Sequence, residues 1–189
     1  MKAARFTAVL ALALCSASVL AGEIKDSNIE ANNAKNYSQG SGSTAQQWIG
    51  IVSGDGKIKN SQIQASDAKN TAQGSGSRAT QVIGGAKDSG LIKDTEVRAN
   101  RAQNTAKGSN SVAEQGIGVA AGNGRIVDSR IHANKAINTA VGSDSRALQS
   151  IGRVENDGKL KNVHVHATRA TNTAGGSNST ADQRIGVAQ

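Results

Sequence analysis

The sequence repeats itself at a fixed interval of 34 residues. The segment that begins Asn70-Thr71-Ala72 has a counterpart in every unit, and no insertion or deletion interrupts the spacing. An apolar residue opens each unit, at Ile24, Ile58, Ile92, Ile126 and Leu160. Repetition this regular indicates that every unit folds alike and buries its apolar side against its neighbours. It also argues against an enzyme, because an active site is a single place and these units are near-copies of one another.

Constant and variable positions alternate within the units. Ser75, Ser77, Ala79, Gln81 and Ile83 have identical counterparts in all five copies, whereas the positions between them change. A period of two is typical of a β-strand with one buried face. The same alternation occurs over residues 61–65 and 68–72. Each unit is therefore predicted to contain about three short strands, separated by glycine-rich turns.

The pattern predicts an all-β protein, a parallel β-solenoid (β-helix) in which each 34-residue unit forms one coil. Neighbouring strands are about 4.8 Å apart, so five stacked coils would extend about 24 Å. The units are 24–57, 58–91, 92–125, 126–159 and 160–189. Helical tetratricopeptide repeats share the interval, but their aromatic and proline positions have no counterpart and a period of two does not fit a helix. Disorder is the other alternative, although a disordered chain has no reason to keep strict phase.

The composition limits what can lie inside such a coil. Aromatic residues make up 2% of the chain, so alanine and serine are expected to fill a thin interior. Two apolar columns are expected along the axis, Ile29, Ile63, Val97, Ile131 and Val165, and Ile49, Ile83, Ile117, Ile151 and Ile185. Buried amides are expected to bond from coil to coil in two ladders. The ladders comprise Asn36, Asn70, Asn104, Asn138 and Asn172, and Gln47, Gln81, Gln115, Gln149 and Gln183.

Residues 1–21 have the organisation of a secretory signal peptide. Lys2 and Arg5 give a positive start, residues 6–14 form an apolar run too short to span a bilayer, and residues 19–21 resemble a cleavage site. Cleavage after Ala21 would remove Cys15, the single cysteine, so neither a disulfide nor a lipid anchor is expected. The whole chain has a formal charge of +8, and losing the two leader cations leaves +6. We expect a secreted protein, extracellular or at the cell surface.

Short motifs resemble the repeats of known fibre proteins. The Ser-x5-Gln spacing from Ser75 to Gln81, preceded by Asn-x-Ala, resembles the curlin repeat, whose units are shorter than this one. The run Gly-Val-Ala-Ala-Gly-Asn-Gly at 118–124 resembles the repeats of Fap-type fibre subunits. The run Gly-Ser-Asn-Ser-Val-Ala at 108–113 is similar to the β-roll heads of trimeric autotransporter adhesins. Curlin and Fap proteins are secreted bacterial functional amyloids of biofilms, so the resemblance implies a fibre subunit.

Outward positions provide the candidate binding sites. A basic edge is expected from Lys57, Lys59, Lys93, Arg125, Lys159 and Lys161. It could contact anionic polysaccharide or lipopolysaccharide, or it could simply discourage wrong strand pairing. No specific nucleic-acid partner is predicted, because aromatic residues for base stacking are missing. His132, His164 and His166 share one face, but without a carboxylate or cysteine they favour a solvated surface over a metal site, and no cofactor is expected.

Two smaller features complete the outward surface. Thr71, Thr105, Thr139 and Thr173 form a column, but the second threonine row that ice-binding solenoids usually carry is missing. Tyr37 and Trp48 are the aromatic residues after the leader, and both lie in the first unit. They are expected to cover the N-terminal end of the stack or to contact a partner.

These observations together predict a secreted structural repeat protein without catalytic activity, a subunit of a bacterial surface fibre or biofilm matrix. Solenoids usually end in atypical capping repeats, and both ends of this chain keep the repeat pattern. Axial, head-to-tail self-association is therefore expected. No segment is expected to span a membrane. The alternative is a discrete surface adhesin, or a module that binds carbohydrate or anionic polymers through the basic edge.

Overall fold

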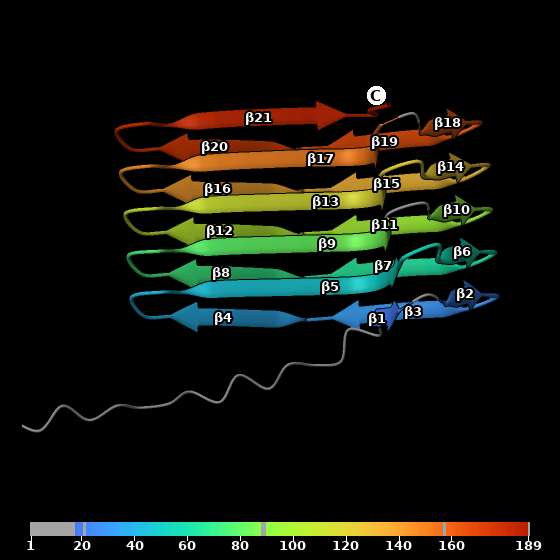
Figure 1. Cartoon of the computed structure of the whole chain (residues 1–189), viewed down its shortest axis with the longest axis horizontal. Helices are drawn as coiled ribbons and strands as arrows, with labels where there is room; N and C mark the ends of the chain where they lie inside the picture. Colours follow the sequence, from blue (N-terminus) through green and yellow to red (C-terminus); the bar gives the residue numbers. More distant parts are fainter. Residues whose placement is uncertain (1–17, 21, 88–89, 157, 189) are drawn as a thin grey trace, which may run out of the picture.

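The structure, a computed structural model, describes residues 18–20, 22–87, 90–156 and 158–188. Regular structure in these ranges is all β-strand, arranged as four parallel sheets that wind into a solenoid of five coils (Figure 1). The predicted all-β parallel β-solenoid is confirmed. Equivalent residues of successive units face each other, as Ile63 faces Val97 and Val97 faces Ile131. Within the described ranges, no helix is long and apolar enough to cross a membrane.

Each coil contributes one strand to each sheet. The long-strand sheet contains β5 (Thr44–Ser53), β9 (Arg78–Ala86), β13 (Val112–Ala120), β17 (Arg146–Val154) and β21 (Thr180–Ile185), with the short β1 (Ser18–Leu20) beside β5. The short-strand sheet contains β2 (Glu23–Lys25), β6 (Lys57–Lys59), β10 (Leu91–Lys93), β14 (Arg125–Val127) and β18 (Lys159–Lys161).

Two sheets of five-residue strands complete each coil. The β3 sheet contains β3 (Asn28–Asn32), β7 (Gln62–Ser66), β11 (Glu96–Asn100), β15 (Arg130–Asn134) and β19 (His164–Thr168). The β4 sheet contains β4 (Lys35–Gln39), β8 (Lys69–Gln73), β12 (Gln103–Lys107), β16 (Ile137–Val141) and β20 (Thr171–Gly175). In Figure 1 these two sheets lie side by side behind the long-strand sheet.

The prediction of about three strands per coil is wrong, because each coil has four. The strand that was missed belongs to the short-strand sheet, for example β6, where Ile58 is the one buried residue of three. A three-residue strand with a single inward side chain is too short to show a period of two. The alternation that revealed the longer strands therefore could not reveal this one.

Residues at positive φ turn the chain at two corners of each coil. The corner before the β3 sheet is formed by Asp26, Asn60, Asp94, Asp128 and Asn162, with φ between 45° and 51°. The corner before the β4 sheet is formed by Asn33, Asp67, Arg101, Lys135 and Arg169. Asparagine and aspartate adopt this conformation more readily than most side chains. The first corner consequently carries carboxylates and amides in an unbroken column.

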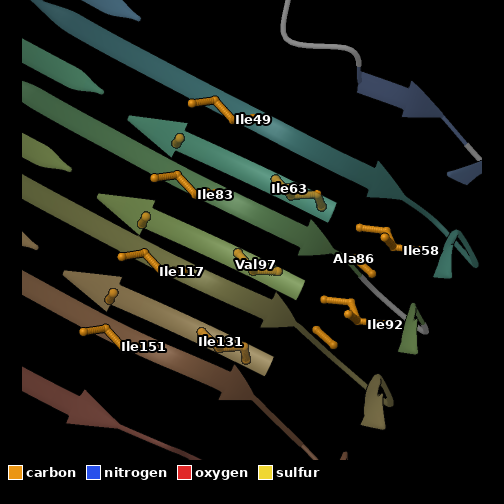
Figure 2. Packing of buried hydrophobic residues seen from close by; sticks show 14 of the residues in the cluster. Ile49, Ile58, Ile63, Ile83, Ala86, Ile92, Val97, Ile117, Ile131 and Ile151 are labelled. Atoms are coloured by element: carbon orange, nitrogen blue, oxygen red, sulfur yellow. The ribbon is translucent and has the colours of Figure 1, made fainter. Parts of the chain in front are cut away.

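The core has two compartments. In the larger one, Figure 2 shows Ile83 and Ile117 in a column that faces a second column with Val97 and Ile131. The smaller compartment consists of alanines: Ala45, Ala72, Ala79, Ala106, Ala113, Ala140 and Ala147. Small inward side chains are thus confirmed, with one correction. Ser77 is buried, but Ser75 of the same parity is exposed because it lies in the turn between β8 and β9.

The two ends of the stack differ. At the N-terminal end, residues 18–20 of β1 pair in parallel with residues 51–53 of β5. Ser18 lies opposite Ile51, an interval of 33 residues, so β1 is not in register with the repeat. At the C-terminal end, no strand among the described residues covers the outer edge of the fifth coil (Figure 1). Ile185 there is 47% exposed.

Most of the predicted signal peptide falls outside the part of the chain that the structure describes. Residues 1–17 and Ala21 are not described, and they include Lys2, Arg5, Cys15 and the residue that precedes the predicted cleavage point. The signal peptide and its cleavage therefore stay predictions.

Candidate functional site

The asparagine column is a continuous hydrogen-bonded ladder. Asn36 Nδ2 donates to Asn70 Oδ1 at 3.0 Å, and the next three steps along the column are 2.9, 3.0 and 2.9 Å. Each amide also donates to a carbonyl of the long-strand sheet, as Asn104 does to Glu114 at 2.5 Å. Every amide points the same way along the axis. The column therefore ends with an acceptor, Asn36 Oδ1, at one end and a donor, Asn172 Nδ2, at the other.

The glutamine column reverses its direction in the middle. Gln115 Nε2 donates to Gln81 Oε1 at 2.7 Å, whereas Gln149 Nε2 donates the other way, to Gln183 Oε1 at 2.9 Å. The expected bond between Gln115 and Gln149 is therefore not made, and both buried Oε1 atoms lack a partner among the described residues. Half-turns of both the Gln149 and the Gln183 amides would let Gln149 Nε2 donate to Gln115 and Gln183 Nε2 donate to Gln149, which would make the column uniform.

The structure brings the six residues of the basic edge together on the short-strand sheet. One column contains Lys57, Arg125 and Lys159, and the neighbouring column contains Lys59, Lys93 and Lys161. Leu91 interrupts the first column and Val127 the second. The edge is thus a discontinuous pair of rows that runs from β6 to β18 and does not include β2 of the first coil.

Carboxylates beside the basic edge reduce its positive charge. Lys93 Nζ lies 3.7 Å from Asp94, and Lys59 Nζ lies 3.0 Å from Glu23. The hydrogen bond from Lys59 lowers the pKa of Glu23, because it favours the charged carboxylate. The sequence did not reveal the carboxylates at the corner, since that position varies between aspartate and asparagine and gave no sign of where it would lie.

The three histidines are exposed on β15 and β19. His132 and His166 are neighbours in register, with ring centroids 4.7 Å apart, and His164 lies opposite Arg130. Among the described residues, no group of three or more histidines, cysteines or carboxylates has an arrangement that could hold a metal ion. The threonines form the expected column, and Thr71, Thr105 and Thr139 are only partly exposed.

A groove on the outer face of the long-strand sheet was not predicted. It has a volume of about 490 Å³, and its lining includes Val82, Val119 and Leu148. Two of its three cations have partners, because Lys87 Nζ lies 4.2 Å from the ring centre of Trp48 and Arg153 pairs with Glu155. The apolar residues of the groove occupy different columns, so comparison of the repeats could not identify them. We assign no ligand to it.

The two ends of the stack carry complementary rows of hydrogen-bonding groups. Within the stack, Gly40 N donates to Gln73 O in the next coil at 3.0 Å, and Lys69 N donates to Ala34 O in the preceding coil at 2.8 Å. At the upper edge of the fifth coil, the N–H of Gly176 finds no further coil among the described residues. The first coil presents the matching acceptor, the carbonyl of Gln39, at its lower edge.

A serine column shows the same missing partner. Ser145 Oγ lies 2.7 Å from Gly142 O in its own coil and 2.5 Å from Gly175 O in the next coil. Ser179 Oγ, its counterpart in the last coil, contacts Gly176 O and no second carbonyl among the described residues. Sequence comparison identified the serine as constant but could not indicate that its hydroxyl joins two coils. The C-terminal edge, together with the part of the N-terminal edge that β1 does not cover, is therefore the most complete candidate interface on the molecule.

Comparison with known proteins finds no match among protein-family models, curated proteins or solved structures. The class that can be stated is the one defined by the fold: a parallel β-solenoid built from five copies of a 34-residue unit.

Proposed function

We propose that this protein is a secreted structural subunit that assembles end to end into a fibre at the bacterial cell surface or in a biofilm matrix. The observation that carries the proposal is the pair of complementary coil edges, of which β1 covers only residues 51–53. A parallel coil edge exposes alternating N–H and C=O groups, which readily pair with another chain. Contacts between unlike ends do not close on themselves, so they generate filaments.

The direction of the asparagine ladder supports a head-to-tail contact. Asn172 Nδ2 lies at the C-terminal edge, and Asn36 Oδ1 accepts no hydrogen bond from the described residues of its own chain. Continuing the 34-residue interval past the last coil places Asn172 beside Asn36 of the following molecule. A head-to-head contact would bring two acceptors together and leave the ladder broken.

The strand β1 blocks part of the edge that assembly needs. It occupies the edge of β5 along residues 51–53, where the end of a neighbouring fifth coil would have to pair. The predicted cleavage after Ala21 would remove β1 and free this edge. We therefore propose that the uncleaved chain assembles more slowly than the chain that begins at Gly22, which would couple fibre growth to export.

Electron microscopy of the purified protein tests the proposal. The chain that begins at Gly22 should form long unbranched filaments, and the full chain should form them more slowly. Fusion of a folded domain directly after Gln189 should block growth, because the domain would cover the C-terminal edge. The same domain joined by a long flexible linker is the matched control and should permit growth.

Either of two results would contradict axial assembly. One is a directly fused protein that forms filaments at the unfused rate, and the other is an unfused protein that stays monomeric at high concentration. A monomer that sediments with lipopolysaccharide, and loses this binding when Lys57, Lys59 and Lys93 are changed to glutamate, would instead support the adhesin alternative. The gathering of the six cations on one sheet is the observation that favours that alternative.

A further inference from the structure

We propose that opposite charges on the first and last coils select the head-to-tail joint, and that Arg184 of one molecule packs against Trp48 of the next. The inference rests on the proposed axial assembly. It adds the residues that determine which end binds which and in what register the strands pair. The occupant of each open end is a second copy of this chain.

The charges of the two terminal coils are opposite. Residues 23–53 carry a net charge of −1, from Glu23, Asp26 and Glu30 against Lys25 and Lys35. The equivalent residues 159–189 carry a net charge of +3, from Lys159, Lys161, Arg169 and Arg184 against Asp182. Opposite fields on the two ends favour unlike ends over like ends and speed the encounter. A contact between the C-terminal ends of two molecules would bring two fifth coils together, and their like positive charges would repel.

The repeat interval specifies which charged residues meet. In the stack, Glu23 lies opposite Lys57, and Lys159 occupies the equivalent of Lys57 in the last coil. Continuing the interval places Lys159 opposite Glu23 of the following molecule, whose carboxylate would then lie between Lys159 and its own Lys59. His166 comes opposite Glu30 in the same way, next to His132 of its own chain. One like-charged pair, Lys161 with Lys25, also forms, although Lys25 has Asp26 beside it at 3.9 Å.

An aromatic contact would lie on the outer face of the long-strand sheet at the same joint. Trp48 heads the column that ends at Arg184, with Val82, residue 116 and Ser150 between them. Trp48 Nε1 is buried and has no hydrogen-bond partner among the described residues. Its ring already attracts Lys87 Nζ at 4.2 Å, which shows that a cation suits this site. A guanidinium stacks on an indole face more favourably than an ammonium does, so Arg184 suits this ring. Its guanidinium can keep its ion pair with Asp182 of its own chain, at 3.0 Å, while its planar face stacks.

Charge exchange tests the joint. Lys159→Glu alone and Glu23→Lys alone should each raise the concentration needed for filament growth about three- to tenfold at low salt. The double variant should return it to within about twofold of the wild type, because the pair is restored with its signs exchanged. Lys107→Glu is the matched control, since Lys107 is an exposed residue of the central coil far from both ends. It should leave growth unchanged.

Fluorescence of Trp48, the single tryptophan of the chain, gives a second measurement. It requires no substitution of Lys159 or Glu23. Assembly should shift its emission and reduce its quenching by acrylamide. Arg184→Ala should remove most of this shift in those filaments that still form. Retained circular dichroism of each variant monomer shows that the solenoid is folded.

The outcomes separate this joint from axial assembly in general. If wild-type filaments form but the double variant grows no better than the single variants, or Trp48 emission is the same in monomer and filament, the proposed joint is wrong and axial assembly stands. If the wild type forms no filaments, the proposed function fails and the joint fails with it.

Discussion

Replacing Gly108 by alanine is expected to lower the free energy of unfolding by more than about 4 kcal/mol, a loss in the exceptional range for one substitution. Gly108 has φ +154°, a region that side-chain-bearing residues rarely adopt. A Cβ atom built on it would lie 1.5 Å from the carbonyl oxygen of Gly74 in the preceding coil. The obstructing atom is a backbone oxygen, and the N–H of the same Gly74 donates to Lys107 O in the next coil at 2.9 Å, so the segment cannot easily move away. Urea denaturation followed by circular dichroism measures the loss.

Gly76→Ala is the matched control, since it lies two residues after Gly74 in the same type of turn. Its nearest neighbour would be Ser41 O at 3.4 Å, an ordinary contact, and no positive φ is involved. The control should change stability by less than about 1 kcal/mol. Equal losses from the two substitutions would mean that the coils do not approach each other at Gly108 as closely as the structure has them.

Asn104→Leu is expected to cost about 2–4 kcal/mol, the second largest effect that we predict. Asn104 is fully buried, donates to Asn138 Oδ1 at 3.0 Å and accepts from Asn70 Nδ2 at 2.9 Å. Leucine has nearly the same shape but leaves Asn138 Oδ1 without a donor inside the core. The loss can be read from the midpoint of urea denaturation at constant slope.

Gln115→Leu provides a sharp comparison, because it removes an equally buried amide whose Oε1 already has no partner. The substitution leaves only Gln81 Oε1 without its donor, so it should lower the free energy of unfolding by about 1–2 kcal/mol. Replacing the exposed Lys107 by alanine should change stability by less than about 0.5 kcal/mol. If Gln115→Leu destabilises the protein more than Asn104→Leu, the asparagine column does not contribute more to stability than the glutamine column, contrary to our prediction.

The sequence allowed the fold class, the interval and the inward faces of the longer strands to be predicted, because five copies of one unit act as an internal comparison. Positions such as Ala79 and Gln81 are constant since each must fit the same narrow interior in every coil. The short strand typified by β6 was missed because three residues cannot display a period. Ser75 was placed inside wrongly because a turn residue can be constant for its conformation and still be exposed.

What comparison of repeats cannot predict is whatever differs between the coils. The groove beside Val119 and the contact of Lys87 with Trp48 each depend on residues found in one coil only. The reversal at Gln149 is equally invisible, because the orientation of an amide leaves no mark in the sequence. The opposite charges of the first and last coils become meaningful only when the register of the stack is known. Residues that differ between the coils also make the two ends of the stack different, which a head-to-tail interface requires.

Cryo-electron microscopy of filaments grown from the chain that begins at Gly22 tests axial assembly most directly. Strands should run perpendicular to the filament axis at about 4.8 Å spacing, with one subunit every 24 Å or so and no widening at the joint. The fifth coil of each molecule should lie on the first coil of the next, with Asn172 beside Asn36. Filaments joined through the outer face of the long-strand sheet, or single particles at every concentration, would contradict head-to-tail assembly.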